Sequence, residues 1–197
     1  MIVNPTKLAE VLIIEPEVFG DDRGFFYESY NERAFGAVLG LSVHFVQDNH
    51  SRSARDVLRG LHYQIRQPQG KLVRVTAGEI YDVAVDIRRS SPTFGKWTST
   101  TLSAGNKKMV WVPPGFAHGF LVVSDHAEVQ YKTTDYWAPE HERCIAATGI
   151  DPVERQPLAV ERPHHFASDL PHLFPWAARS PALGKTRILE SGLRGWH

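Results

Sequence analysis

Residues 58–75 read LRGLHYQIRQPQGKLVRV, and the rest of the chain is organised around this stretch. Apolar and β-branched residues recur in 57–63 and again in 71–75, which predicts two strands separated by a loop containing Pro and Gly. Side chains on one face of a strand recur at every second residue, so Lys71 is expected to share a face with Val73. The pattern places charged side chains within otherwise apolar strands.

Three ionisable residues mark this stretch: Arg59, His62 and Lys71. Strict alternation puts Arg59 and His62 on opposite faces of their strand, although a bulge at Gly60 would shift that register. Each of the three alone is most simply a core histidine or a charge at a solvated strand edge. A histidine and a lysine that both point into one barrel are costly to bury without a role, so the three together predict a functional site.

Length and composition suit a globular protein that works in a reducing compartment. The 197 residues include 22 basic and 22 acidic residues, so no net charge would attract nucleic acid or a membrane surface. The single cysteine, Cys144, excludes an internal disulfide, and no apolar run has the length of a membrane span. We expect a cytoplasmic protein with a single domain over residues 1–180 and a poorly ordered tail over residues 181–197.

Short strands with Gly and Pro between them make up most of the chain. One helix is predicted after the N-cap Asn31, with its apolar residues on one face before Gly40. Residues 73–76 and 79–87 are predicted to pair as a hairpin around Gly78. The other expected strands are 11–15, 25–29, 43–50, 97–102, 109–112, 118–123 and 128–134. This spacing predicts an all-β fold, a jelly-roll sandwich or barrel with a few short helices.

The strand expected at 43–50 ends in the polar triplet Gln47, Asp48 and Asn49. Such a triplet is usually a turn, but its amides also suit recognition of a uracil-like base or of a sugar. The polar residues 51–56 that follow are expected to form a loop.

The sequence PPGFAHGF at 113–120 resembles the second motif of the cupins, in which a Pro-x-Gly turn precedes a histidine, here His118. Cupins are small jelly rolls, in agreement with the strand pattern. Metal-binding cupins take further ligands from a first motif with two histidines and a glutamate, but residues 62–64 read HYQ and no carboxylate follows before Lys71. The pattern favours a metal-free cupin that performs proton chemistry over a metal-dependent cupin dioxygenase.

A longer series of motifs runs in order through about the first 145 residues. The segments are DDRGFF at 21–26, QDNHS at 47–51, LRGLHYQ at 58–64, QGKLVRV at 69–75, DVAVDIR at 82–88, SPTFGKW at 91–97, VPPGFAHGF at 112–120 and YKTTDYW at 131–137. This series resembles the dTDP-4-dehydrorhamnose 3,5-epimerase family. The resemblance implies inversion of a dTDP-linked 4-keto-6-deoxyglucose at C3 and C5, which gives the L-sugar precursor of rhamnose. It also implies that no cofactor is needed and that the protein is a homodimer with strand exchange near the N-terminus.

The resemblance implies a division of work among the catalytic residues. His62 is the base, a role that suits an imidazole at neutral pH. Lys71, with help from Arg59, supplies positive charge at the C4 oxygen as the enolate forms. Tyr131 returns a proton from the opposite face of the sugar ring. An aspartate behind the histidine holds its tautomer, and Asp169 is the best candidate for it.

The resemblance also implies a set of contacts to the nucleotide and the sugar. Trp137 stands in place of an aromatic residue, usually tyrosine, that stacks on thymine, and tryptophan stacks at least as well. The alternative for Trp137 is a core aromatic on a sheet face. The residues that the resemblance places around the substrate are Arg23, Glu28, Gln47, Asp48, Asn49, Arg59, Lys71, His118, Trp137 and Glu142.

The chain departs from the family pattern after Cys144. The family continues with a Trp-Asn-Asp-Pro segment and later has a lysine before the aspartate, whereas this chain reads AATG at 146–149 and has Ser168. The alternatives are a 3-epimerase or 3,4-ketoisomerase of a dTDP-deoxysugar pathway, and a non-catalytic cupin that binds nucleotide sugars. Tyr131 favours double epimerisation, and the presence of His62, Lys71 and Tyr131 together favours an enzyme.

Overall fold

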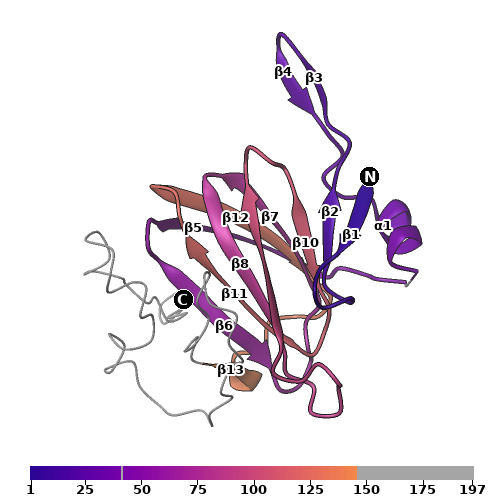
Figure 1. Ribbon diagram of the computed structural model, residues 1–197, viewed down its shortest axis with the longest axis vertical. Helices are drawn as coiled ribbons and strands as arrows, with labels where there is room; N and C mark the ends of the chain where they lie inside the picture. Colours follow the sequence, from indigo (N-terminus) through magenta and orange to yellow (C-terminus); the bar gives the residue numbers. More distant parts are fainter. Residues whose placement is uncertain (41, 146–197) are drawn as a thin grey trace.

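Two antiparallel sheets face each other in the computed structural model, which describes residues 1–40 and 42–145 (Figure 1). The six-stranded sheet contains, in spatial order, β1 (Ile2–Pro5), β2 (Leu12–Glu15), β10 (Met109–Val112), β7 (Lys71–Ala77), β12 (His126–Thr133) and β5 (Gln47–Ala54). The five-stranded sheet contains β13 (Glu142–Cys144), β6 (Leu58–Gln64), β11 (Phe116–Val122), β8 (Glu79–Asp86) and β9 (Trp97–Ser103). The smaller elements are the hairpin of β3 (Phe19–Asp21) and β4 (Gly24–Phe26), helix α1 (Glu32–Leu39) and the 3-10 helix η1 (Pro139–His141).

This architecture confirms the all-β sandwich predicted from the sequence. The predicted domain end at residue 180 and the predicted tail at 181–197 lie outside the described residues. Over the ranges that are described, no helix is long and apolar enough to cross a bilayer.

The core between the two sheets consists of aliphatic side chains from alternating positions. Val73 of β7, Ile80 of β8, Val122 of β11 and Val129 of β12 are all buried in one cluster. Burying an aliphatic side chain contributes about 1.5–3 kcal/mol relative to leaving it exposed. Lys71 has the same parity in β7 as Val73, so its side chain begins on the inward face, as predicted.

Helix α1 packs on the outer face of the six-stranded sheet and confirms the predicted helix. Its N-cap is Asn31, whose side-chain oxygen accepts a hydrogen bond from the backbone N–H of Ala34 at 3.0 Å. Gly40 ends the helix in the left-handed conformation. Phe35 is buried, and its ring centre lies 5.7 Å from that of Trp111. The helix therefore covers the apolar end of that outer face.

The predicted hairpin around Gly78 is wrong, because β7 and β8 belong to different sheets. β7 pairs with β10 and β12, whereas β8 pairs with β11 and β9. Gly78 is the corner at which the chain passes from one sheet to the other, with a φ of 73°. A Cβ at this position would lie 1.9 Å from the carbonyl oxygen of His126, so only glycine fits. A hairpin and a corner both place a glycine between two strands, and local sequence does not separate them.

The strand predicted at 43–50 lies further along the chain, at Gln47–Ala54, so the loop predicted at 51–56 is wrong over its first part. β5 pairs with β12 along its whole length. This ladder satisfies the backbone groups of β5 and overrides the weak strand preference of its polar side chains. Gln47 and Asn49 therefore lie in a strand and not in a turn.

The strand predicted at 25–29 is shorter than expected and forms part of the β3–β4 hairpin. This hairpin projects beyond the sandwich at the top of Figure 1. Phe19, Phe25 and Phe26 on the hairpin are 57%, 62% and 70% exposed. Apolar surface grouped in this way on a projecting element is typical of a contact surface for another protein chain.

Replacing Gly78 is expected to destabilise the fold. Gly78→Ala brings a Cβ against the carbonyl oxygen of His126 and forces a positive φ on alanine, so the free energy of unfolding should fall by more than about 1 kcal/mol. The matched control is Gly105→Ala, whose Cβ would meet nothing closer than Ser103 Oγ at 3.6 Å. Urea unfolding of both variants measures the difference, and equal midpoints would contradict the close approach at Gly78.

Candidate active site

The pairing of β6 with β11 brings three of the predicted site residues to the interior, namely Arg59, His62 and His118. His62 lies opposite His118 and Arg59 lies opposite Phe120, with a register shift between the two pairs. His118 and Phe120 are two residues apart and share one face of β11, so their partners Arg59 and His62 also share a face. The sequence allowed either strict alternation or a bulge at Gly60, and the structure confirms the bulge.

Glycine is required at position 60 for two reasons. Its φ is 125°, a conformation that residues with a Cβ rarely adopt. A Cβ at this position would also lie 2.5 Å from the Cα of Gly119. The backbones of β6 and β11 thus touch at the point where the register shifts.

Arg59, His62 and His118 form a group of ionisable side chains in the interior, and inward side chains of β7 and β12 complete this group. Tyr131 of β12 packs against the main core cluster, and Lys71 starts the inward row of β7. Lys71 interacts electrostatically with Glu142 and Asp82, and Tyr131 with Arg59 and Glu142. Side chains from β6, β7, β8, β12 and β13 therefore converge inside one end of the sandwich.

The ammonium group of Lys71 is poorly solvated. Burial lowers the pKa of Lys71 to about 8, although the carboxylates of Glu142 and Asp82 act in the opposite direction. A lysine with this pKa is mostly charged at neutral pH. Because little water screens it, its charge acts strongly on a nearby oxygen.

Tyr131 keeps its proton at neutral pH and can donate it. Burial raises the pKa of the Tyr131 phenol, and the positive charge of Arg59 only partly offsets this effect. Arg59 is itself held in place, because its Nε donates a hydrogen bond to Ser53 Oγ at 2.8 Å. Ser53 is buried, and sequence reasoning did not identify it.

Glu142 lies between His62 and Trp137. Its Oε1 is 3.1 Å from His62 Nδ1, and its Oε2 accepts a hydrogen bond from the indole Nε1 of Trp137 at 3.0 Å. The contact with His62 lowers the pKa of Glu142 against the effect of burial, and Trp137 and Lys71 lower it further. Glu142 is therefore a carboxylate at neutral pH.

Asp82 is a site residue that sequence reasoning missed. Its Oδ2 lies 2.8 Å from His118 Nε2, and both side chains are buried. The signal was present in the segment 82–88, where Asp82 alternates with valine and has the same parity as the buried Ala84. A carboxylate at an inward position of an apolar strand needs a buried partner, and here the partner is His118.

Gln47 and Asn49 lie beside Trp137 at the edge of this group. Gln47 Nε2 donates to Asn49 Oδ1 at 2.9 Å, and Gln47 Oε1 accepts from the backbone N–H of Trp137 at 3.0 Å. Trp137 is 40% exposed, which is too much for a core aromatic. Its ring therefore remains accessible to a ligand.

Three predicted residues are not brought to this group by the structure. Arg23 lies on the projecting hairpin and pairs with Asp21. Glu28 follows the hairpin and accepts a hydrogen bond from Asn31 at 3.1 Å. Asp48 points to the outer face of the sheet. A fourth, Asp169, lies outside the described residues.

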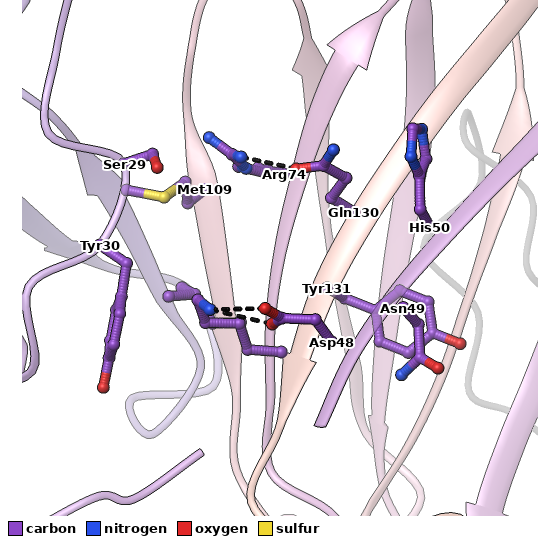
Figure 2. A pocket seen from close by; sticks show the side chains of 11 residues that line it. Ser29, Tyr30, Asp48, Asn49, His50, Arg74, Met109, Gln130 and Tyr131 are labelled. Atoms are coloured by element: carbon purple, nitrogen blue, oxygen red, sulfur yellow. Dashed lines mark hydrogen bonds and ion pairs between the residues drawn. The ribbon is translucent and has the colours of Figure 1, made fainter. Parts of the chain in front are cut away.

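The outer face has a hollow of its own, of about 440 Å³ (Figure 2). Asp48 lines it and lies 2.9 Å from Lys132 Nζ, and Arg74 lines it and donates to Gln130 at 2.5 Å. Arg74 is three residues from Lys71, so it points to the opposite face of β7. Nowhere in residues 1–40 and 42–145 do three or more His, Cys, Asp or Glu side chains gather so as to hold a metal ion.

The titration of Lys71 tests the electrostatics of the interior. In protein with lysine labelled at Cε and Nζ, one lysine should lose its proton near pH 8, because burial disfavours its charged form. A lysine in water loses its proton at about pH 10.4. Lys71→Gln should remove the transition near pH 8 and thereby assign it to Lys71. If every lysine titrates as in water, the interior is more hydrated than the geometry indicates.

Comparisons with known proteins point to one family. The family model described as dTDP-4-dehydrorhamnose 3,5-epimerase matches residues 5–152. The chain is 64% identical over 167 residues to the dTDP-4-dehydrorhamnose 3,5-epimerase of Pseudomonas aeruginosa, which covers 81% of this chain and 92% of that protein.

Solved structures agree with this result. The dTDP-6-deoxy-D-glucose-3,5-epimerase of Legionella pneumophila, in complex with dTDP-4-keto-L-rhamnose, matches with a TM-score of 0.73 and 54% identity over 77% of this chain and 79% of that one. A 3'-monoepimerase from Streptomyces bikiniensis, in complex with dTDP-quinovose, matches with a TM-score of 0.70 and 29% identity over 81% and 83% of the two chains. The sandwich is thus a cupin-type fold, and the chain belongs to the dTDP-4-dehydrorhamnose 3,5-epimerase family.

Proposed function

We propose that this chain converts dTDP-4-dehydro-6-deoxy-D-glucose to dTDP-4-dehydro-L-rhamnose by inverting C3 and C5, a step of dTDP-L-rhamnose biosynthesis. The observation that carries the proposal is the convergence of His62, Lys71 and Tyr131 inside the sandwich of a chain of this family. These residues supply a base, a positive charge and an acid, which epimerisation next to a ketone requires. We place the reaction in the cytoplasm, where a chain with one cysteine suits the reducing conditions.

The reaction proceeds by proton removal and return at each carbon. His62 takes the proton from the carbon next to the C4 ketone, and the electron pair moves into an enolate with its charge on the C4 oxygen. Lys71 is mostly protonated at neutral pH, because its pKa is about 8, and stabilises that charge. Tyr131 then donates its phenolic proton to the opposite face of the carbon. Proton exchange with solvent restores His62 and Tyr131 for the second carbon.

The residues around the catalytic group suit a nucleotide diphosphate sugar. Arg59 and His118 offer donors to the diphosphate and the sugar from the interior, and Gln47 and Asn49 offer amides at the edge. Trp137 offers an accessible aromatic face on which thymine can stack. This binding assignment rests on the positions of these groups and on the resemblance to the family.

The comparisons favour double epimerisation over the alternative enzymes. The chain is 64% identical to a 3,5-epimerase and 29% identical to a 3'-monoepimerase. Tyr131, the proposed acid, is partly buried and keeps its proton at neutral pH, as both inversions require. The presence of both His62 and Tyr131 in the interior argues against a binding protein without activity. A binding site does not need both a base and an acid.

We also propose that the protein works as a homodimer in which the β3–β4 hairpin of one copy completes the site of the other. Arg23 lies in the turn of this hairpin, and its side chain is 90% exposed. The hairpin projects away from β6, the strand that contains His62 (Figure 1). The exposed Phe25 and Phe26 on the same hairpin provide apolar surface for the contact. A two-fold dimer would let each hairpin serve the opposite site.

Incubation with the 4-keto sugar nucleotide in deuterated water tests both the reaction and the role of Tyr131. The wild type should incorporate deuterium at C3 and C5 and form the inverted product. Tyr131→Phe should still exchange protons with solvent but form little product, because His62 can only return a proton to the face from which it took it. His62→Ala should abolish exchange at both carbons.

Nuclear magnetic resonance measures exchange and product in the same sample. Normal inversion by Tyr131→Phe would eliminate Tyr131 as the acid. A wild type that exchanges neither carbon would refute the proposed function, and exchange at C3 alone would identify a monoepimerase.

Mixing two impaired variants tests the homodimer. Arg23→Ala should bind substrate weakly, and His62→Ala should be inactive. A mixed dimer has one site with His62 from one copy and Arg23 from the other, so mixing followed by subunit exchange should restore activity. A mixture no more active than its components would contradict the shared site, and sedimentation would report whether dimers are present at all.

A further inference from the structure

The carboxylate of Glu142 is engaged by protein groups at both oxygens. Oε1 lies 3.1 Å from His62 Nδ1, and Oε2 accepts the indole N–H of Trp137 at 3.0 Å. The side chains of His62 and Glu142 are only 26% and 21% exposed, so water screens the contact weakly. A carboxylate can only accept hydrogen bonds, so it favours the tautomer in which the facing histidine nitrogen carries a proton.

The contact is close but not yet a well-formed hydrogen bond. Nδ1 of His62 is itself buried, and its alignment with Glu142 is poor although the separation is that of an ion pair. Across the described ranges Nδ1 has no hydrogen bond of good geometry to any group. A buried N–H in this state is costly, so a small rotation towards Glu142 is favourable. Hydrogen bonds in active sites are often misaligned before substrate binds and tighten afterwards.

The backbone fixes Glu142 at this place. β13 pairs with β6 so that Glu142 lies opposite Gln64, two residues from His62 on the same face. Diagonal neighbours on antiparallel strands are within reach of a long side chain. The pairing continues beyond the strand, where Ile145 and Leu61 exchange backbone hydrogen bonds of 2.9 and 3.3 Å.

Gln64 fixes the segment that carries Trp137. Its buried side chain accepts a hydrogen bond from the backbone N–H of Ala138 at 2.8 Å and donates one to the carbonyl oxygen of Tyr136 at 3.2 Å. The residues on both sides of Trp137 are therefore held to β6. The same strand thus positions the base and the indole that binds Glu142.

We propose that Glu142, oriented by Trp137, is the positioning residue that keeps the proton of His62 on Nδ1 and leaves Nε2 free to act as the base. The inference rests on the proposed function, in which His62 removes the substrate proton. A fixed tautomer matters because only an unprotonated nitrogen can take that proton. Glu142 thereby has the role that the resemblance assigns to Asp169.

Geometry favours this role for Glu142 over the sugar contact that the resemblance implies, because both oxygens already face protein donors. It also gives Trp137 a function besides stacking. The indole N–H holds Oε2, which directs Oε1 towards His62. A phenylalanine at this position would offer a ring face but no donor.

The first test reads the tautomer of His62 in the absence of substrate. In protein with ¹⁵N-labelled histidine, the chemical shifts of the two ring nitrogens report which one carries the proton, and a His62→Gln sample assigns the signals. The wild type should show a protonated Nδ1 and a bare Nε2. Glu142→Gln has one acceptor oxygen in place of two and cannot serve both Trp137 and His62, so a mixture of tautomers is expected.

The second test separates kcat from KM. Glu142→Gln should lower kcat by roughly ten- to a hundredfold, the range found when a carboxylate behind a metal-bound histidine is removed, with little change in KM. Trp137→Phe keeps the ring face and should lower kcat in the same direction. Glu140→Gln is the matched control, because it removes the same charge from a side chain that is 66% exposed, and it should change neither constant.

Three results would overturn the inference. One is an unchanged tautomer in Glu142→Gln, and another is a rise in KM alone, which would make Glu142 a sugar contact. The third is a mixture of tautomers in Asp169→Asn while Glu142→Gln behaves as the wild type. A wild type that exchanges no substrate protons refutes the proposed function instead, whatever the tautomer of His62.

Discussion

The close contact between Gly60 and Gly119 is the constraint on which the site depends. Their backbones approach so closely that any side chain at position 60 would collide with β11. The register shift at this contact turns Arg59 and His62 to the same side of β6. With strict alternation, one of the two would point away from the interior. A short segment of β6 thus places both Arg59 and His62 in the interior.

The charged side chains inside the sandwich are tolerated because they compensate one another. Asp82 faces His118, Glu142 faces His62, and both carboxylates attract Lys71. Removing an ion from water still costs several kcal/mol, and the attraction between partners offsets this only in part. For Lys71 the remaining cost is visible as a pKa lowered to about 8. In the proposed reaction, the same poor solvation would strengthen the field that the charge of Lys71 exerts on a developing enolate.

Features that depend on local chemistry could be predicted from the sequence. The N-cap Asn31, the strand at 109–112 and the inward face of Lys71 follow from capping and alternation. The change of sheet at Gly78 and the strand Gln47–Ala54 could not be predicted, because they depend on which distant strand supplies the backbone hydrogen bonds. The periodicity of the sequence determines on which face of a strand a side chain lies. It does not determine which other strand pairs with that strand.

The contact between Glu142 and His62 is of this second kind, since it requires β13 to pair with β6. The other oxygen of Glu142 accepts from the indole of Trp137, where the family pattern usually has tyrosine. Both Glu142 and Trp137 lie within residues 5–152, the range that the family model matches. The carboxylate that contacts His62 therefore comes from the part of the chain that matches the family. Because Glu142 lies within the matched range and Asp169 lies beyond it, the proposed orientation of His62 by Glu142 need not depend on Asp169.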